Sequence, residues 1–292
     1  LFFVAMPMEA KVRYVKSGST GDGSSWVSAL GSLQTAINES AAGDEIWVAA
    51  GVYAPEELIK SSRPLSRAFI MKSGVSIYGG FAGTEADKTE RALKEGGKAY
   101  DFVNETILSA DDDVADIWVR EFQDATTYRY AWHVENSVIP GTADNYHHVL
   151  YAAGELVDAT EINGLTLKGA HANDYKSKAA GGALYAKGNI TLKACKVVEN
   201  SAWFKNESTG SSDTNGGAVY LVGSGNATIT ECYFARNYSH SSYGRGLGGA
   251  VYAKNVTISN CDFEDCVALE NGGGHRLHVQ QLLRRFGRCH LQ

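Results

Sequence analysis

The sequence predicts an all-β chain: a single-stranded, right-handed parallel β-helix, or solenoid, with a short N-terminal capping helix. One phrase recurs three times, as "GGALYA" (181–186), "GGAVYL" (216–221) and "GGAVYA" (248–253). A second phrase follows each of them and ends in cysteine. The chain also has 32 glycines and only 4 prolines, which is typical of many short strands joined by tight turns. We expect the coils to be right-handed because connections between parallel strands of one sheet are almost always right-handed.

The cysteine-terminated phrases are "NITLKAC" (189–195), "NATITEC" (226–232) and "NVTISNC" (255–261). Apolar and polar residues alternate in all three, which indicates strands with one buried face. A fourth glycine pair stands at 272–273, and the second glycines of the four pairs lie 35, 32 and 24 residues apart. Strands that recur at this length with no helix between them are expected to stack coil upon coil, with one loop per coil of variable length.

Stacking predicts columns of like residues at the corners of the coils. Cys195, Cys232 and Cys261 share one inward position, where parallel side chains favour a column of thiols over disulfides. Disulfides remain the alternative for an exported protein. Asn200 and Asn237 mark a second corner, where asparagine tolerates the left-handed backbone conformation and can hydrogen-bond the main chain of the neighbouring coil. The glycine pairs mark a corner where a Cβ atom is costly.

The rest of the chain supports the same architecture. Residues 11–70 are expected to form an N-terminal cap and first coil, in which "GSLQTAINESA" (31–41) is a helix with Ser32 as its N-cap. Residues 71–274 are expected to form the coils, with an insertion at about 111–147 that is rich in charged and aromatic residues. The earlier β-type segments are 45–53, 74–81, 106–110, 148–154 and 162–170.

The two ends of the chain differ from the middle. The apolar opening 1–10 is typical of a signal-peptide remnant, and an ordinary first strand is the alternative. Residues 275–292 hold 4 of the 12 arginines and no Asp or Glu. If the codons of this segment are read one base later, β-branched residues follow "NGGG", as the repeat would require at the start of a strand. One interpretation is therefore that the tail is frameshifted and not native. A basic capping helix is the other.

The glycine phrases and the segments that follow them resemble the repeats of a known family. The glycine phrase followed by "VVEN" (197–200) or "FARN" (234–237) resembles the GGA[ILV]…FxxN repeat of polymorphic outer-membrane proteins. The third coil departs from it, with Cys266 in place of the asparagine. "GDGSSW" (21–26) and "VSIYGGFAGTE" (75–85) are similar to the opening of pectin-lyase-like surface proteins of Gram-negative bacteria. The resemblance implies a β-helix that is secreted or held at the cell surface, on the outer membrane.

The sequence offers few candidates for catalysis. A net charge of −6 argues against nucleic acid as a partner, and no apolar run is long enough to span a bilayer. The acidic group Asp111, Asp112, Asp113 and Asp116 is interpreted as a solvated loop and not as a calcium site. His147 and His148 are expected to be one turn residue and one strand residue pointing apart, and not metal ligands. We therefore predict no catalytic residue, no metal ligand and no cofactor.

Aromatic residues supply the candidate binding surface. The predicted set combines insert-loop residues with one tyrosine per coil: Trp203, Phe204, Tyr238, Tyr243, Tyr185, Tyr220 and Tyr252. They either stack on the sugar rings of a polysaccharide or host-surface glycan, or simply cover the sheet. The predicted function is an exported cell-surface protein that acts in adhesion or glycan binding without catalysis. The alternative, a polysaccharide lyase or glycoside hydrolase, depends on fold analogy alone.

Overall fold

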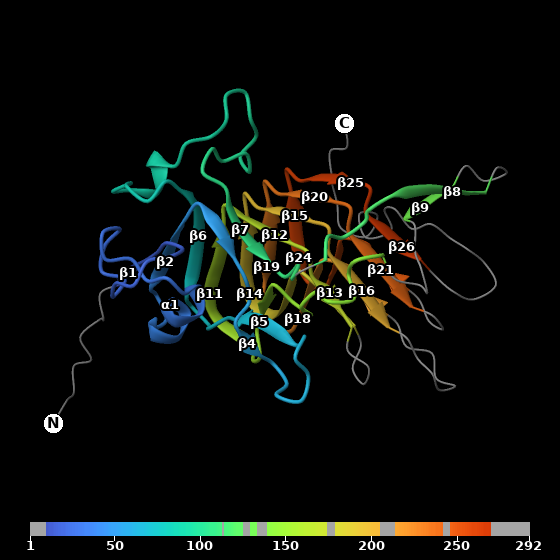
Figure 1. Cartoon of the computed structure of the whole chain (residues 1–292), viewed down its shortest axis with the longest axis horizontal. Helices are drawn as coiled ribbons and strands as arrows, with labels where there is room; N and C mark the ends of the chain where they lie inside the picture. Colours follow the sequence, from blue (N-terminus) through green and yellow to red (C-terminus); the bar gives the residue numbers. More distant parts are fainter. Residues whose placement is uncertain are drawn as a thin grey trace.

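The chain folds into a solenoid of stacked parallel strands, as the computed structural model in Figure 1 shows. The predicted all-β parallel β-helix is therefore confirmed. The structure describes residues 10–112, 114–124, 129–132, 139–173, 179–204, 214–241 and 246–269. The signal-peptide remnant, apart from Ala10, and the tail 275–292 lie outside these residues.

The coils form four faces that run along the solenoid. The first face has the strand order β1 (Val12–Val15), β2 (Glu45–Ala49), β6 (Ser76–Phe81), β11 (Leu156–Asn163), β14 (Leu184–Lys193), β19 (Ala227–Thr230) and β24 (Val256–Ser259). The second face is β3 (Gly51–Tyr53), β7 (Thr106–Ser109), β12 (Leu165–Lys168), β15 (Lys196–Val198), β20 (Tyr233–Ala235) and β25 (Asp262–Glu264). All of these neighbours pair in parallel.

The other two faces complete each coil. The third face is β13 (His171–Ala172), β16 (Ser201–Phe204), β21 (Tyr238–Ser241) and β26 (Val267–Leu269), beside which β17 (Thr214–Asn215) pairs with β22 (Gly246–Leu247). The fourth face is β5 (Arg67–Ile70), β10 (Leu150–Tyr151), the first half of β14, β18 (Val219–Val222) and β23 (Val251–Ala253). The short strand β4 (Glu57–Leu58) joins β5 in antiparallel fashion.

Like residues lie above one another inside the coils, as the aligned repeats predict. Leu192 of β14 pairs with Ile229, and Ile229 with Ile258. The rings of Phe234 and Phe263 stack with centroids 4.8 Å apart and 7° between their planes. Apolar residues of the first, second and fourth faces meet inside the coils, and each also contacts its counterparts in the coils above and below, so the core is one continuous column along the solenoid.

The asparagine corner agrees with the prediction in its hydrogen bonds and differs from it in its backbone. The Asn237 amide nitrogen donates to the Val197 carbonyl at 2.8 Å, and its Oδ1 accepts from the Asn200 backbone N–H at 3.1 Å. The left-handed residues, however, are Glu199, Arg236 and Asp265, each one position before the predicted corner residue. The predicted left-handed asparagine is thus wrong, because the turn is made one residue earlier.

The glycine and cysteine columns agree with the sequence. Gly216 has φ +67°, and a Cβ on Gly217 would lie 2.2 Å from the Gly249 carbonyl oxygen, so neither position accepts a side chain. The described cysteines are free thiols, and those of the predicted column hydrogen-bond between coils. The Cys232 Sγ, for example, lies 3.2 Å from the Thr230 carbonyl and 3.5 Å from the Leu192 carbonyl.

The N-terminal end of the solenoid is closed by a helix and a loop. The helix α1 (Leu33–Glu39) begins after Ser32, whose Oγ accepts from the Thr35 N–H at 3.0 Å. The helix lies beside β1 and β2 (Figure 1), and its buried apolar side chains, Leu33, Ala36 and Ile37, belong to the core of the solenoid. The loop before it pairs with the free edge of β1, the Leu30 N–H donating to the Tyr14 carbonyl at 2.9 Å. The edge strand is therefore covered.

Two further segments leave the coils between β6 and β10. The first contains the 3-10 helix η1 (Lys88–Glu90) and crosses to the second face, where the Lys98 Nζ lies 2.8 Å from the Asp262 carboxylate. The second is the predicted insertion, which holds the antiparallel pair β8 (Arg120–Asp124) and β9 (Arg129–Trp132). Its Trp118 and Ile139 pack against Tyr238 and Val267 of the third face.

Candidate functional site

Four tyrosines form an outward column on the fourth face, one on each of four consecutive strands, in the order Tyr151, Tyr185, Tyr220 and Tyr252. Their ring centroids are 5.0, 5.0 and 5.5 Å apart along the column, with interplanar angles of 20°, 23° and 9°. We call these residues the tyrosine column. Alternation explains its position: Leu184, Val219 and Val251 are buried, so the next residue on each strand faces outward.

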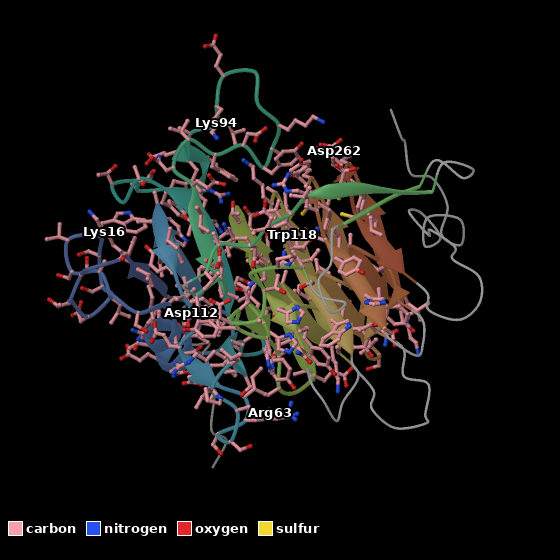
Figure 2. All side chains as sticks on the ribbon, turned by 45° about the vertical axis from the view of Figure 1, so that its right-hand side comes forward. Lys16, Arg63, Lys94, Asp112, Trp118 and Asp262 are labelled. Carbon is pink, nitrogen blue, oxygen red and sulfur yellow. The ribbon has the colours of Figure 1, made fainter. Side chains whose placement is uncertain are left out.

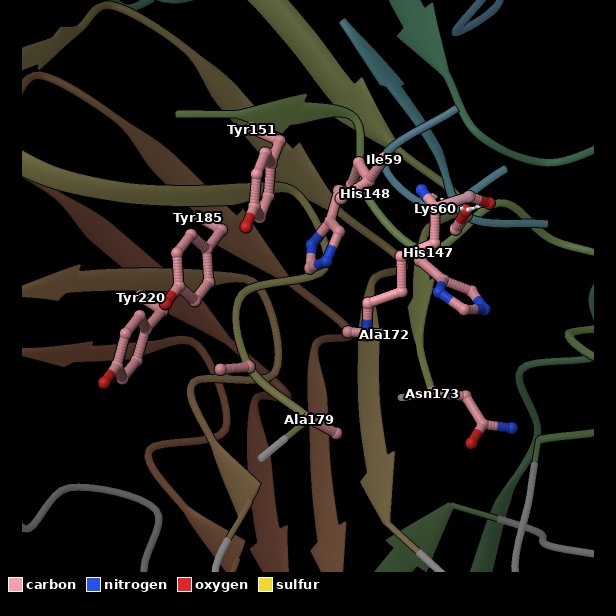
Figure 3. Close-up of a pocket in the computed structure, with 12 residues that line it drawn as sticks. Ile59, Lys60, His147, His148, Tyr151, Ala172, Asn173, Ala179, Tyr185 and Tyr220 are labelled. Atoms are coloured by element: carbon pink, nitrogen blue, oxygen red, sulfur yellow. Dashed lines mark hydrogen bonds between the residues drawn. The ribbon is translucent and has the colours of Figure 1, made fainter. Parts of the chain in front are cut away.

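A pocket of about 270 Å³ lies beside one end of the tyrosine column (Figure 3). His148 stands between the column and the pocket, with its ring centroid 5.3 Å from that of Tyr151 and 5.9 Å from that of Tyr185. The His148 Nδ1 lies 2.9 Å from the Gly181 carbonyl oxygen. Because a carbonyl only accepts, this contact assigns the proton of a neutral ring to Nδ1. The lining residues are Ile59, Lys60, Ser66, His147, His148, Tyr151, Ala172, Asn173, Ala179, Ala180, Tyr185 and Tyr220.

Two hydroxyls of the tyrosine column, those of Tyr185 and Tyr220, lie in surroundings that favour the uncharged form. Burial raises the pKa of Tyr185 above its usual value. Burial also raises the pKa of Tyr220, and the neighbouring Tyr185 and Tyr252 add to this effect. Both phenols therefore keep their protons at neutral pH and present groups that can donate as well as accept hydrogen bonds.

The structure places the predicted aromatic residues in two groups. Tyr185, Tyr220 and Tyr252 lie together in the tyrosine column, as the repeat predicts. Tyr238 is 1% exposed and Trp203 is 9% exposed, so the prediction that they lie on exposed loops is wrong. Tyr238 belongs to β21 and is covered by the insertion, while Trp203 stacks on His171 with ring centroids 6.3 Å apart. Tyr243 and the side chain of Phe204 lie outside the described residues.

The two histidines also depart from the prediction. His147 and His148 both precede β10, and both line the same pocket (Figure 3). His148 is therefore not the predicted strand residue, because the strand begins at Leu150, whereas the two rings do point to different sides, as predicted (Figure 3). Within the described ranges, no three His, Cys, Asp or Glu side chains are grouped as ligands for a metal ion.

The acidic group in the insertion is only partly a solvated loop. Asp112 is exposed and accepts from the Tyr146 hydroxyl at 2.9 Å (Figure 2 labels Asp112). Asp116 is half-buried, and the Asn145 side-chain amide donates to both of its oxygens at 3.2 and 3.0 Å. Burial is the main cause that raises the pKa of Asp116 to about 7. Asp113 lies outside the described residues.

Sequence reasoning missed Tyr151 and did not connect His148 with the tyrosines. Their coil has no glycine pair, so the repeat alignment passes over it. The signal is nevertheless present, since "LYA" (150–152) is identical to "LYA" (184–186). The structure pairs Leu150 with Leu184 and Tyr151 with Tyr185, which extends the predicted column by one coil.

Comparisons with known proteins add little to this geometry. No protein-family model matches the chain, and no curated protein matches it. Among solved structures, the chain is similar to one titled "Crystal structure of pectate lyase Pel9A", with a TM-score of 0.45 and 15% sequence identity. The match covers 88% of this chain and 50% of that one, so this chain spans half the length of that structure. In the described part of the chain, no helix has the length and hydropathy needed to cross a membrane.

Proposed function

We propose that this protein binds an extended polysaccharide along the tyrosine column and acts in adhesion or glycan binding without catalysis. The observation that carries the proposal is the column itself: four tyrosines repeat in register on one face and lead to a pocket that contains His147 and His148. Tyrosine combines a rigid apolar body with a polar end, which suits it to a partner rich in hydroxyls.

A repeating ligand matches a repeating surface. Adjacent strands of a solenoid are about 4.8 Å apart, so a polymer lying along the axis meets a similar group at every coil. Several weak contacts on one linear ligand then act together, and the combined affinity exceeds that of any single contact. The same arrangement gives little advantage to a small ligand, which spans one coil only.

The side chains that line the pocket favour binding of a glycan over its hydrolysis. Hydrolysis of a glycosidic bond commonly needs two carboxyl groups that flank it, whereas the described residues that line the pocket include no Asp or Glu. The runner-up function, a polysaccharide lyase or glycoside hydrolase, is kept as an outcome of the test.

A glycan screen tests the proposal. The purified protein is run through gels that contain uronic-acid polymers, neutral polysaccharides or host-type glycans, and its retardation is measured. We expect at least one polymer to retard the wild type and to lose this effect with Tyr185→Ala/Tyr220→Ala. No retardation by any polymer would contradict the proposal, and new unsaturated or reducing ends in the polymer would favour the enzyme instead.

We further propose that the protein is exported and displayed at the cell surface of a Gram-negative bacterium, with coils of the polymorphic outer-membrane protein type. The glycine phrases followed by "VVEN" and "FARN" support this proposal. Cell fractionation with an antibody against the solenoid tests it. Recovery of the protein in the cytoplasm alone would contradict it.

A further inference from the structure

The tyrosine column hides the part of each ring that usually binds sugars. Tyr185 lies between Tyr151 and Tyr220, with both centroid distances at 5.0 Å. Tyr220 lies between Tyr185 and Tyr252, at 5.0 and 5.5 Å. Because the interplanar angles are 23° or less, both faces of these two rings are covered by their neighbours. A sugar ring therefore has no aromatic face to stack on at the centre of the column.

The hydroxyl ends of the rings remain accessible. In Figure 3 the hydroxyls of Tyr151, Tyr185 and Tyr220 lie at the ends of the rings farthest from the strands and point to the same side. The hydroxyls of Tyr185, Tyr220 and Tyr252 make no hydrogen bond with the described residues, and none of them is among the buried polar atoms that lack a partner. They consequently reach solvent, where a ligand can bond them.

We propose that the column recognises its ligand edge-on, through a row of phenol hydroxyls, and that the ligand is a linear glycan lying along the solenoid axis. Tyr185, Tyr220 and Tyr252 each supply one hydroxyl to a hydroxyl or carboxylate oxygen of the glycan. Stacking on ring faces contributes nothing at Tyr185 and Tyr220. This inference depends on the proposed function, and it differs from both sequence-based alternatives, in which the tyrosines either stack on sugar rings or only cover the sheet.

The neighbouring tyrosines explain why the hydroxyls are well placed for this role. Stacking between rings fixes each ring in one orientation, so little side-chain entropy remains to be lost when a ligand binds. The parallel strands then hold successive hydroxyls on one line, at the spacing of the coils. A row of this kind selects a chain that is extended and unbranched on the side facing the protein.

Exchange of tyrosine for phenylalanine separates edge-on recognition from stacking. Tyr185→Phe/Tyr220→Phe/Tyr252→Phe keeps the stacked rings and removes three hydroxyls, whereas the corresponding triple alanine variant removes both. Affinity for the polymer that retards the wild type most strongly is measured for each variant by gel retardation. The matched control is Tyr100→Phe, which removes the hydroxyl of another outer stacked tyrosine, 5.5 Å from Tyr233 on the second face.

We expect the triple phenylalanine variant to bind about tenfold or more weakly than the wild type, because each lost hydrogen bond carries a modest share of the affinity. The Tyr100→Phe control should bind as the wild type does. Wild-type affinity in the phenylalanine variant, with loss only in the alanine variant, would overturn edge-on recognition and leave the proposed function standing. Wild-type affinity in both variants would overturn the proposed function as well.

Two additional measurements complete the test. If circular dichroism shows that the triple variant does not fold, the single variant Tyr220→Phe is used in its place. Tyr220 lies inside the column, and this substitution removes only one oxygen atom. An oligosaccharide length series tests the axial orientation: affinity should rise with length until the chain spans the column. A short oligosaccharide that binds as tightly as the polymer would overturn that orientation.

Discussion

Replacing Asn237 with alanine should destabilise the solenoid more than any exposed substitution, because this side chain joins successive coils. Asn237 is fully buried. Its amide nitrogen donates to the Val197 carbonyl at 2.8 Å, and its Oδ1 accepts from the Asn200 backbone N–H at 3.1 Å. Alanine removes both of these bonds, together with the contacts of the Asn237 side chain to the Asn200 Nδ2 and the Cys266 Sγ.

The magnitude follows from the backbone N–H of Asn200, which loses its acceptor when the Asn237 side chain is removed. A buried polar group left without a hydrogen bond costs about 1–3 kcal/mol. Asn237→Ala should therefore lower the free energy of unfolding by about 1–3 kcal/mol. The Asn200 side chain is less affected, since its amide nitrogen also donates to the Leu167 and Val198 carbonyls.

Urea denaturation followed by circular dichroism measures this loss. The matched control is Asn226→Ala, because Asn226 is exposed and its backbone N–H, which alanine keeps, makes the bond to Asn189. The control should stay within about 0.5 kcal/mol of the wild type. A loss below about 1 kcal/mol for Asn237→Ala would refute the reasoning that the corner side chains hold the coils together.

Three further predictions concern ionisation and the thiols. The pKa of Asp116 is raised to about 7 by burial, so its contribution to stability is complete below the unfolded pKa of about 4 and is lost as pH rises to 7. Asp116→Asn should remove this loss in pH-dependent urea unfolding, and an unchanged pH profile would contradict the assignment. Burial lowers the pKa of His171 to about 4, so its contribution is present above about pH 6.5 and is lost as pH falls to 4. His171→Gln should therefore remove a loss of stability at low pH, whereas Asp116→Asn removes one at high pH. A His171→Gln variant that still loses this stability as pH falls would contradict the prediction. A reductant should leave the thermal midpoint unchanged because the described cysteines are free thiols, and a marked fall would indicate a disulfide.

The sequence predicted the repeating parts of the fold well, because each stacked coil obeys the same constraint. The columns that contain Tyr185, Cys232 and Ile229 all follow from one alignment of three phrases. The helix capped by Ser32 was equally accessible, since its N-cap and apolar spacing are local signals.

Features that depend on contacts between distant segments were beyond the sequence. Tyr238 resembles an exposed loop residue in sequence, and it is buried only because Trp118 and Ile139 of the insertion pack on it. The covered ring faces of Tyr185 are likewise a property of the stacked coils. The alternation of the strand indicates which way the ring points, whereas the distance to the next ring sets what the ring can bind.

The most direct test of the account is nuclear magnetic resonance of protein labelled with carbon-13 at the tyrosine Cζ, the atom that carries the hydroxyl. Signals are assigned with single Tyr→Phe variants, and the polysaccharide that retards the wild type is then added. We predict that the signals of Tyr151, Tyr185, Tyr220 and Tyr252 shift together, while those of the buried Tyr53 and Tyr78 do not. Saturating glycan that leaves the four column signals in place and shifts tyrosines elsewhere would contradict the account.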